Sequence, residues 1–222
     1  MSDKEKKIVQ LEERVMTANE KVAAVVRKEF EAHKQLAINL MSSPGSGKTT
    51  LLCETCNRLK DRFPVYVIEG DQQTENDADR IRRTGVPACQ VNTGECCHLE
   101  AQMIKDACAK LKPAEHSVIF IENVGNLVCP AEFDIGEAHK VVVLSVTEGE
   151  DKPLKYPYMF LACDLMLLTK TDLLPYVDFN VEKCFEYARR VNPNIRCLIL
   201  SSKTGEGFDE WTSWIEKELS AL

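Results

Sequence analysis

Short apolar runs alternate with helical patterns along most of this sequence, and that alternation restricts the possible folds more than any other feature. The apolar runs predict strands at residues 37–41, 65–69, 117–122, 140–146, 164–169 and 196–201, with a weaker seventh at 87–91. Most are apolar on both faces, as is typical of parallel strands covered by helices on each side. Between them, helical patterns lie near residues 48–61, 75–84, 97–111, 178–191 and 207–220. This order predicts an α/β fold with a doubly wound, mostly parallel sheet of about seven strands.

The N-terminal segment follows a different pattern. Apolar residues recur there every three or four positions, at Ile8, Leu11, Val15, Ala18, Val22 and Val25. That spacing predicts a long amphipathic helix over residues 3–32. The helix either packs on its own domain, which we favour, or serves as a docking or dimer helix. We therefore predict an N-terminal helix within residues 1–34 and one globular domain over residues 35–222.

The composition excludes several functional classes. The chain has 28 Lys and Arg against 35 Asp and Glu, a net charge of −7, so a general nucleic-acid binder is not expected. No apolar run approaches the roughly 18–20 residues that span a bilayer, and the first residues lack the apolar core of a secretory signal. We expect a cytoplasmic protein. In that compartment most of its ten cysteines should be buried small hydrophobes, with a few binding metal or acting in redox chemistry.

A phosphate-binding loop follows the first predicted strand. Residues 42–50 read SSPGSGKTT and lead directly into a helical pattern. This is the Walker A arrangement, in which backbone N–H groups at a helix N-terminus wrap phosphates. One position departs from the motif, because Ser42 stands where its first glycine is usual. We expect Lys48 to neutralise the β- and γ-phosphates and Thr49 to ligate Mg²⁺. The nucleotide-binding residues expected in this loop are Gly45, Ser46, Gly47, Lys48, Thr49 and Thr50.

Carboxylates follow two further strands and suit a Mg²⁺–phosphate site. Asp71 and Asp77 come after the strand at 65–69, and Glu122 ends the strand at 117–122. Carboxyl ends of parallel strands are where open α/β sheets place ligands. Glu122-x-x-Gly125 is similar to the switch element of GTPases, where the glycine N–H meets the γ-phosphate. Taken alone, Asp77 fits a helix N-cap as well as a Mg²⁺ ligand. We expect Lys48, Asp71 and Glu122 to serve catalysis.

Two later segments have the residues of a guanine pocket. Thr169-Lys170-Thr171-Asp172 follows a strand and resembles the [NT]-K-x-D element of GTPases. Asp172 can accept hydrogen bonds from guanine N1–H and the 2-amino group, a pair of donors that adenine lacks. The stem of Lys170 can lie over the purine. Ser202 and Lys203 lie in a loop similar to the S-A-K loop, although an ordinary strand–turn–helix connection would look alike. The order of phosphate, switch and base elements favours GTP.

Thiol and imidazole groups gather in a separate set. Cys97 and His98 are adjacent, with Cys96 alongside, and Cys129 lies four residues beyond Gly125. Thiolate and imidazole together suit Ni²⁺ or Zn²⁺. Adjacent ligands do not form the usual closed chelate, so an open site, or one shared between two subunits, is expected. Cys53 and Cys56 share one face of a helix and are expected to be core residues.

Together these motifs resemble the HypB family of hydrogenase nickel-insertion GTPases. The stretches that carry the resemblance are SSPGSGKTT, EGDQQTENDADR, NTGECCHLEA, ENVGNLVCP, TKTDLLP and SSKTGEG, in register over about residues 35–220. The resemblance implies a P-loop fold and a low-turnover GTPase that binds Mg²⁺ near Asp71, Asp77 and Glu122. It also implies Ni²⁺ or Zn²⁺ binding by Cys97, His98 and Cys129 at the interface of a GTP-dependent homodimer. The implied partners are a HypA-type nickel metallochaperone and the [NiFe]-hydrogenase large-subunit precursor.

Three other functions are compatible with parts of the sequence. A P-loop kinase would need arginines in a lid, and Arg82-Arg83 are the pair that could supply them. A metal-storage protein with a vestigial nucleotide site is disfavoured because four residues of that site are intact, namely Lys48, Thr49, Asp71 and Glu122. A urease-type nickel-maturation GTPase shares the class and is disfavoured by the stretch GECCHLE.

Overall fold

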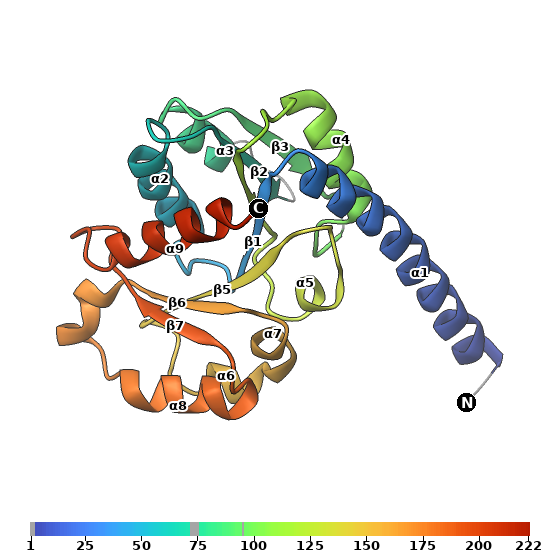
Figure 1. The fold of residues 1–222 in the computed structure, drawn as a ribbon. Coiled ribbons are helices and arrows are strands. Elements are labelled where there is room, and N and C mark those ends of the chain that lie inside the picture. Colours follow the sequence, from blue (N-terminus) through green and yellow to red (C-terminus); the bar gives the residue numbers. More distant parts are fainter. Residues whose placement is uncertain (1–2, 72–75, 95) are drawn as a thin grey trace.

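A seven-stranded parallel sheet forms the centre of the molecule (Figure 1). The computed structural model describes residues 3–71, 76–94 and 96–222, with side chains from residue 14 onward. The strand order is β3-β2-β4-β1-β5-β6-β7, and every recorded pairing is parallel. The strands are β1 (Leu36–Ser42), β2 (Val65–Asp71), β3 (Ala88–Asn92), β4 (Val118–Glu122), β5 (His139–Ser145), β6 (Leu165–Thr169) and β7 (Arg196–Ile199). The predicted fold class and all seven predicted strands are confirmed, with ends shifted by at most two residues.

Helices cover both faces of the sheet, as the two-sided apolar strands require. One face packs against α2 (Lys48–Leu59), α3 (Asn76–Arg82) and α9 (Phe208–Ser220). The other packs against the C-terminal part of α1 (Asp3–Ala32), α4 (Ala101–Leu111), α7 (Pro157–Leu161) and α8 (Val181–Val191). Four short elements were not predicted, namely α7, α5 (Cys129–Glu132), α6 (Lys152–Lys155) and the 3₁₀ helix η1 (Thr171–Tyr176). Within the described ranges, no helix is long and apolar enough to cross a membrane.

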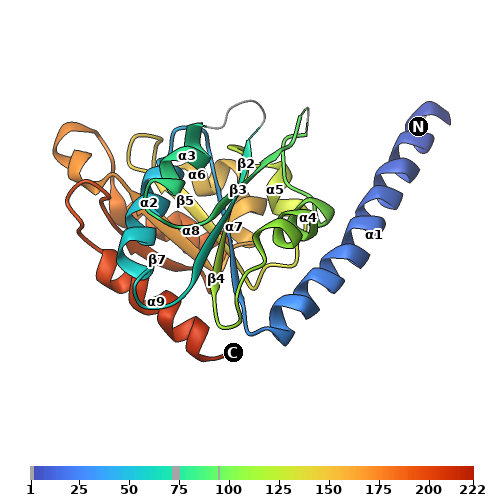
Figure 2. The ribbon, with the colours of Figure 1, turned by 90° about the horizontal axis from the view of Figure 1, so that it is seen from above.

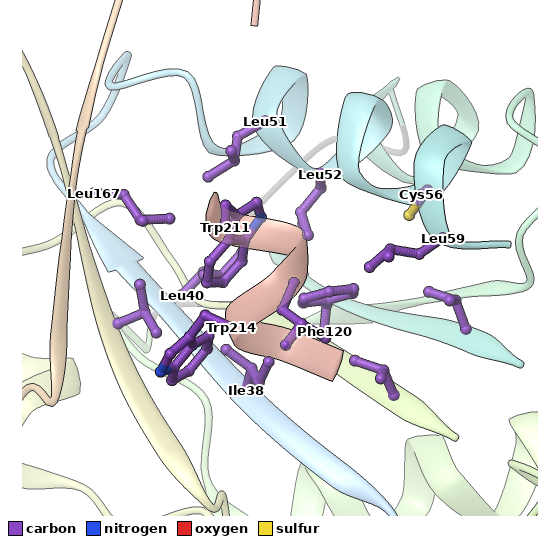
Figure 3. Packing of buried hydrophobic residues seen from close by; sticks show 14 of the residues in the cluster. Ile38, Leu40, Leu51, Leu52, Cys56, Leu59, Phe120, Leu167, Trp211 and Trp214 are labelled. Carbon is purple, nitrogen blue, oxygen red and sulfur yellow. The ribbon is translucent and has the colours of Figure 1, made fainter. Parts of the chain in front are cut away.

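The largest cluster of buried apolar side chains lies between the sheet and helices α2 and α9. Figure 3 shows Trp211 and Trp214 of α9 beside side chains of α2 and of the sheet. The two indole rings stack with centroids 5.3 Å apart. Trp211 is fully buried, and its Nε1–H donates to Thr55 Oγ1 at 3.0 Å. Deleting a buried ring of this size typically costs about 3–5 kcal/mol, so this contact fixes α2 and the loop before it on the sheet.

Among the described side chains of helix α1, those of its C-terminal part pack against the rest of the molecule. Figures 1 and 2 show its N-terminal end extending away from the rest of the molecule. Ala23, Val26 and Phe30 are buried, whereas Val15 and Val25 are exposed. The predicted apolar stripe is therefore wrong over most of the described part, since the buried stripe is displaced by one position. Ile8 and Leu11 fall in the part whose side chains are not described.

The packed part of α1 also supplies polar contacts. Asn19 Oδ1 accepts the N–H of Ala101, the first residue of α4, at 2.9 Å. Its Nδ2 donates to the carbonyl of Asp134 at 2.7 Å, and Arg27 pairs with the Asp134 carboxylate at 2.6 Å. An N-cap from another helix satisfies a donor that α4 leaves free. These contacts select the face of α1 that is buried, which the apolar periodicity alone did not do.

Candidate functional site

The phosphate loop connects β1 to α2, and its backbone is shaped by two glycines. Gly45 and Gly47 have φ angles of 75° and 97°, the left-handed region that glycine adopts without strain. Lys48 is buried at the start of α2, and its Nζ donates to Ser42 Oγ at 2.6 Å. Ser46 Oγ donates to the same oxygen at 2.6 Å. Ser42, the departure from the usual motif, thus holds the lysine in the loop, and burial lowers the pKa of Lys48.

Two buried carboxylates lie at the end of the sheet beside this loop. Thr49 Oγ1 donates to Glu122 Oε1 at 2.8 Å. Glu69 on β2 is the register neighbour of Glu122 on β4, so both side chains lie on the same face. In the described part of the chain, Glu69 Oε2 and Glu122 Oε2 are buried and have no hydrogen-bond partner. Burial raises the pKa of Glu122 to about 7 and, together with the neighbouring Glu122 charge, that of Glu69 to about 8.

These oxygen atoms fit a hard divalent cation. Mg²⁺ prefers carboxylate, hydroxyl and phosphate oxygens, and a bound cation would offset the charge that burial penalises. The predicted ligands Thr49 and Glu122 are in direct contact. Glu69 was not predicted. An acid inside an otherwise apolar strand was a signal in the sequence, but only the register with Glu122 brings it to the site.

A cavity of about 570 Å³ opens in front of the loop and the carboxylates. Asp71 and Asp77, both predicted, line it together with Glu69, Glu122 and Gly125. Residues 72–75, which belong to the predicted switch stretch and include the expected first residue of helix 75–84, lie outside the described residues.

An arginine that the sequence did not single out also lines this cavity. Arg80 on α3 pairs with Asp77 at 3.0 Å and donates to Thr50 Oγ1 at 2.9 Å. Arg82, one of the pair considered for a kinase lid, instead binds Asp79 and the carbonyl of Ala88. Of these arginines, Arg80 is therefore the one that lines the phosphate cavity, together with Lys48 and Lys170.

The segment after β4 packs closely on the phosphate loop. A Cβ atom added to Gly125 would lie 3.1 Å from both Pro44 Cα and Pro44 N. Such contacts are tighter than ordinary van der Waals distances, so any larger residue would push the two segments apart. Gly125 thus lies directly against the phosphate loop and lines the same cavity.

The predicted base residues line a second cavity, of about 310 Å³. It is lined by Thr169 at the end of β6, by Lys170 and Asp172 just after that strand, and by Ser202 and Lys203 after β7. Asp172 Oδ1 accepts a hydrogen bond from Ser201 Oγ at 2.6 Å, which orients the carboxylate. Lys170 Nζ donates to the carbonyl of Gly45 at 2.7 Å, so its stem bridges the two cavities. The predicted phosphate and base residues are therefore adjacent in space.

Cys97, His98 and Cys129 converge on one point. One potential ligand atom from each lies within 4.8 Å of the others. Cys97 Sγ is 3.7 Å from His98 Nδ1, and the imidazole stacks on Phe133 with ring centroids 3.7 Å apart. Burial lowers the pKa of His98, which favours the neutral ring that binds metals. The hydrogen bond with Cys129, then burial, raises the pKa of Cys97 to about 11, so a metal has to displace a proton there.

The remaining cysteines mostly have the structural roles predicted for them. Cys56 is fully buried in the cluster between α2 and the sheet (Figure 3). Cys53 packs against that cluster. Cys163 and Cys184 are buried on the opposite face, where Cys197 packs against them. Cys96 is not part of the three-residue group that could hold a metal ion.

Comparisons with known proteins agree with this geometry. The family description "CobW/HypB/UreG, nucleotide-binding domain" matches residues 36–198. The hydrogenase maturation factor HypB of Escherichia coli K12 is 60% identical over 217 residues, which cover 98% of this chain and 75% of that protein. The structure of Helicobacter pylori HypB in complex with nickel superposes with a TM-score of 0.86 and 40% identity, covering 92% and 96% of the two chains. The structure of Archaeoglobus fulgidus HypB superposes with a TM-score of 0.85 and 36% identity, covering 92% of this chain and 100% of that chain.

Proposed function

Because the chain belongs to the CobW/HypB/UreG family and, within it, to the HypB hydrogenase maturation factors, we propose that it couples GTP binding and hydrolysis to nickel delivery. In this proposal the protein converts GTP and water into GDP and phosphate with low turnover. It takes up Ni²⁺ as cargo and supports nickel insertion into a [NiFe]-hydrogenase large-subunit precursor. Zn²⁺, which accepts the same ligands, competes for the site.

One observation supports the coupling more than any other. The short segment after β4 contacts the phosphate loop at Gly125 and supplies Cys129 to the thiol and imidazole group four residues later. A γ-phosphate that draws the Gly125 N–H toward it would therefore move the Cys129 thiolate. Because coupling between two ligands is reciprocal, a metal held by Cys129 would change the affinity for GTP by the same factor.

The residues of the nucleotide site have distinct roles in this proposal. Lys48 and the loop N–H groups neutralise the phosphates, and Asp172 selects guanine. Thr49, Asp71, Asp77 and Glu122 hold Mg²⁺ directly or through water. Mg²⁺ would supply positive charge at the β- and γ-phosphate oxygens. Lys48, Asp71 and Glu122 form the catalytic set, with the acids orienting the attacking water.

Among the residues that the structure describes, the thiol and imidazole group does not complete a closed metal site. Three protein ligands converge, one short of the four that closed zinc sites use. We propose that a second copy of this chain docks across the site when GTP is bound, so that two such groups meet. A HypA-type metallochaperone would then exchange nickel with this labile site in the cytoplasm.

Hydrolysis of GTP and ATP in the absence of any phosphate acceptor tests the enzymatic part. The proposal predicts Mg²⁺-dependent phosphate release from GTP, weak or no release from ATP, and loss of release in Lys48→Ala with the fold intact by circular dichroism. Release that appears only with an added acceptor would favour a kinase. No nucleotide binding at all would favour a storage protein. Reconstitution with hydrogenase and with urease precursors separates the hydrogenase role from a urease-type role.

A further inference from the structure

We propose that Asn123 is the positioning residue that transmits the state of the nucleotide site to the Cys97–His98 loop. This inference rests on the coupling between nucleotide state and metal affinity proposed above. It names the side chain that connects Cys97 and His98 to the nucleotide site. Cys129 is linked to Gly125 along the chain, but Cys97 and His98 come from a distant segment and need a link of their own.

Asn123 lies between Glu122 and Gly125 in the segment at the end of β4, which we call the switch segment. It follows Glu122, whose carboxylate accepts the Thr49 hydroxyl, and precedes Gly125, which packs on the phosphate loop. The residue is 2% exposed. A displacement of the backbone at residues 122–125 therefore moves this side chain within a closely packed environment.

The Asn123 amide oxygen joins the switch segment to the metal-ligand loop. Oδ1 accepts the N–H of Leu99 at 3.1 Å and the N–H of Val124 at 3.0 Å. Leu99 is the residue directly after His98. The bond to Leu99 therefore ties the backbone beside two metal ligands to the backbone beside the phosphate-sensing glycine, across 24 residues of sequence.

The orientation of the Asn123 amide is fixed by partners on its other side. Nδ2 donates to Asn39 Oδ1 at 3.2 Å, and Asn39 Nδ2 donates to Glu137 Oε1 at 3.0 Å. The second carboxylate oxygen of Glu137 accepts the N–H of Ile135 at 2.8 Å. Since backbone N–H groups only donate, the oxygen of Asn123 has to face Leu99 and Val124, and the network has one consistent direction.

The Leu99 side chain makes a second contact with the nucleotide site. It is fully buried, and a Cβ atom added to Gly70 would lie 2.7–2.9 Å from its branched end. Gly70 precedes Asp71, which lines the phosphate cavity. Leu99 is thus held by its N–H at the end of β4 and by its side chain at the end of β2. A change at either strand end is passed to the backbone of His98.

The test compares metal affinity in two nucleotide states. Ni²⁺ binding is titrated with Mg²⁺–GDP and with a non-hydrolysable GTP analogue for the unmodified chain, Asn123→Ala and Asn192→Ala. Asn192 is the matched control, because its amide is also hydrogen-bonded, with Nδ2 donating to the carbonyls of Phe160, Leu161 and Cys163 and Oδ1 accepting the N–H of Asn194. These partners neither line the two nucleotide cavities nor belong to the thiol and imidazole group. We expect the ratio of the two affinities, typically about 5- to 150-fold in coupled systems, to fall below about twofold in Asn123→Ala and to persist in Asn192→Ala.

The outcomes separate this inference from the function it rests on. Equal affinities in the unmodified chain would contradict the coupling itself. A ratio retained in Asn123→Ala, with the unmodified chain coupled, would overturn only the role of Asn123. If Asn123→Ala does not fold, amide hydrogen exchange on the unmodified chain decides the matter. The Leu99 amide should be protected in both nucleotide states, and exchange at the rate of an unprotected amide in either state would overturn the proposal.

Discussion

The hydroxyl of Thr49 donates a 2.8 Å hydrogen bond to the buried carboxylate of Glu122, and this contact joins the phosphate loop to the end of β4. The same strand end continues through Asn123 and Gly125 to Cys129. Glu122, proposed to hold Mg²⁺, and Cys129, proposed to bind nickel, are therefore only seven positions apart in the chain.

Replacing Glu122 with glutamine should weaken Mg²⁺-dependent nucleotide binding. Loss of a charge-assisted contact to the cation costs about 1.5–3 kcal/mol of binding free energy. The Mg²⁺ concentration needed for half-maximal GTP binding should therefore rise roughly 10- to 100-fold. Calorimetric titration of GTP across a Mg²⁺ series measures it. Glu54→Gln, on the half-exposed ion pair with Arg58, is the control. An unchanged Mg²⁺ requirement would exclude Glu122 from the cation site.

Asp172→Asn should change the base preference. The variant loses a charged acceptor opposite guanine N1–H and the 2-amino group, which should weaken GTP binding by about 1–3 kcal/mol. Xanthine nucleotides, which offer a carbonyl in place of the amino group, should gain affinity. Competition with a fluorescent nucleotide reports both changes, and exposed Asp178→Asn serves as the control. If ATP binds the unmodified chain as tightly as GTP, the assignment of the base site is wrong.

Cys97→Ala and Cys129→Ala should each sharply reduce Ni²⁺ and Zn²⁺ affinity, whereas Cys53→Ala should leave it unchanged. Because the pKa of Cys97 is raised to about 11, metal binding at neutral pH has to release the thiol proton. Affinity should therefore fall as the pH is lowered. Titrations in two buffers of different ionisation enthalpy count the protons released. Metal binding without proton release would argue against thiolate ligation.

His139 should make the stability of the fold depend on pH. Its Nδ1 lies 3.2 Å from Asp164 and its Nε2 lies 3.3 Å from Glu218, and the hydrogen bond with Asp164 is the main reason that its pKa is raised above 6.5. The stabilisation is complete below the unfolded pKa of about 6.5 and is lost as the pH rises through the higher folded value. Because Asp164 is more than half exposed, we expect an effect of only about 0.5 kcal/mol.

Urea unfolding at pH 6 and pH 8.5 measures this effect, and the neighbouring Trp214 indole, 5.0 Å from the imidazole ring, supplies a fluorescence signal. His139→Gln should lose stability relative to the unmodified chain at pH 6 and differ less at pH 8.5. The opposite pH dependence would show that His139 is neutral in the folded state.

The sheet and most of the residues that line the two cavities were predictable because both depend on local signals. Strands apolar on both faces stand out, and the phosphate loop is a contiguous motif at a strand end. Glu69 was missed because its role depends on the β2–β4 register. The buried stripe of α1 was misplaced by one position because polar contacts of Asn19 and Arg27 select the buried face. Helices α5, α6 and α7 have only four or five residues, too few to show a period.

The central claim is that nucleotide state and metal affinity are coupled, and one thermodynamic cycle tests it directly. Ni²⁺ affinity of the unmodified chain is measured with Mg²⁺–GDP and with a Mg²⁺-bound non-hydrolysable GTP analogue, and nucleotide affinity is measured with and without Ni²⁺. We predict that Ni²⁺ binds at least about fivefold more tightly with the GTP analogue than with GDP. Bound Ni²⁺ should then raise the ratio of the affinity for the analogue to the affinity for GDP by the same factor. Equal Ni²⁺ affinity in the two nucleotide states would contradict the account.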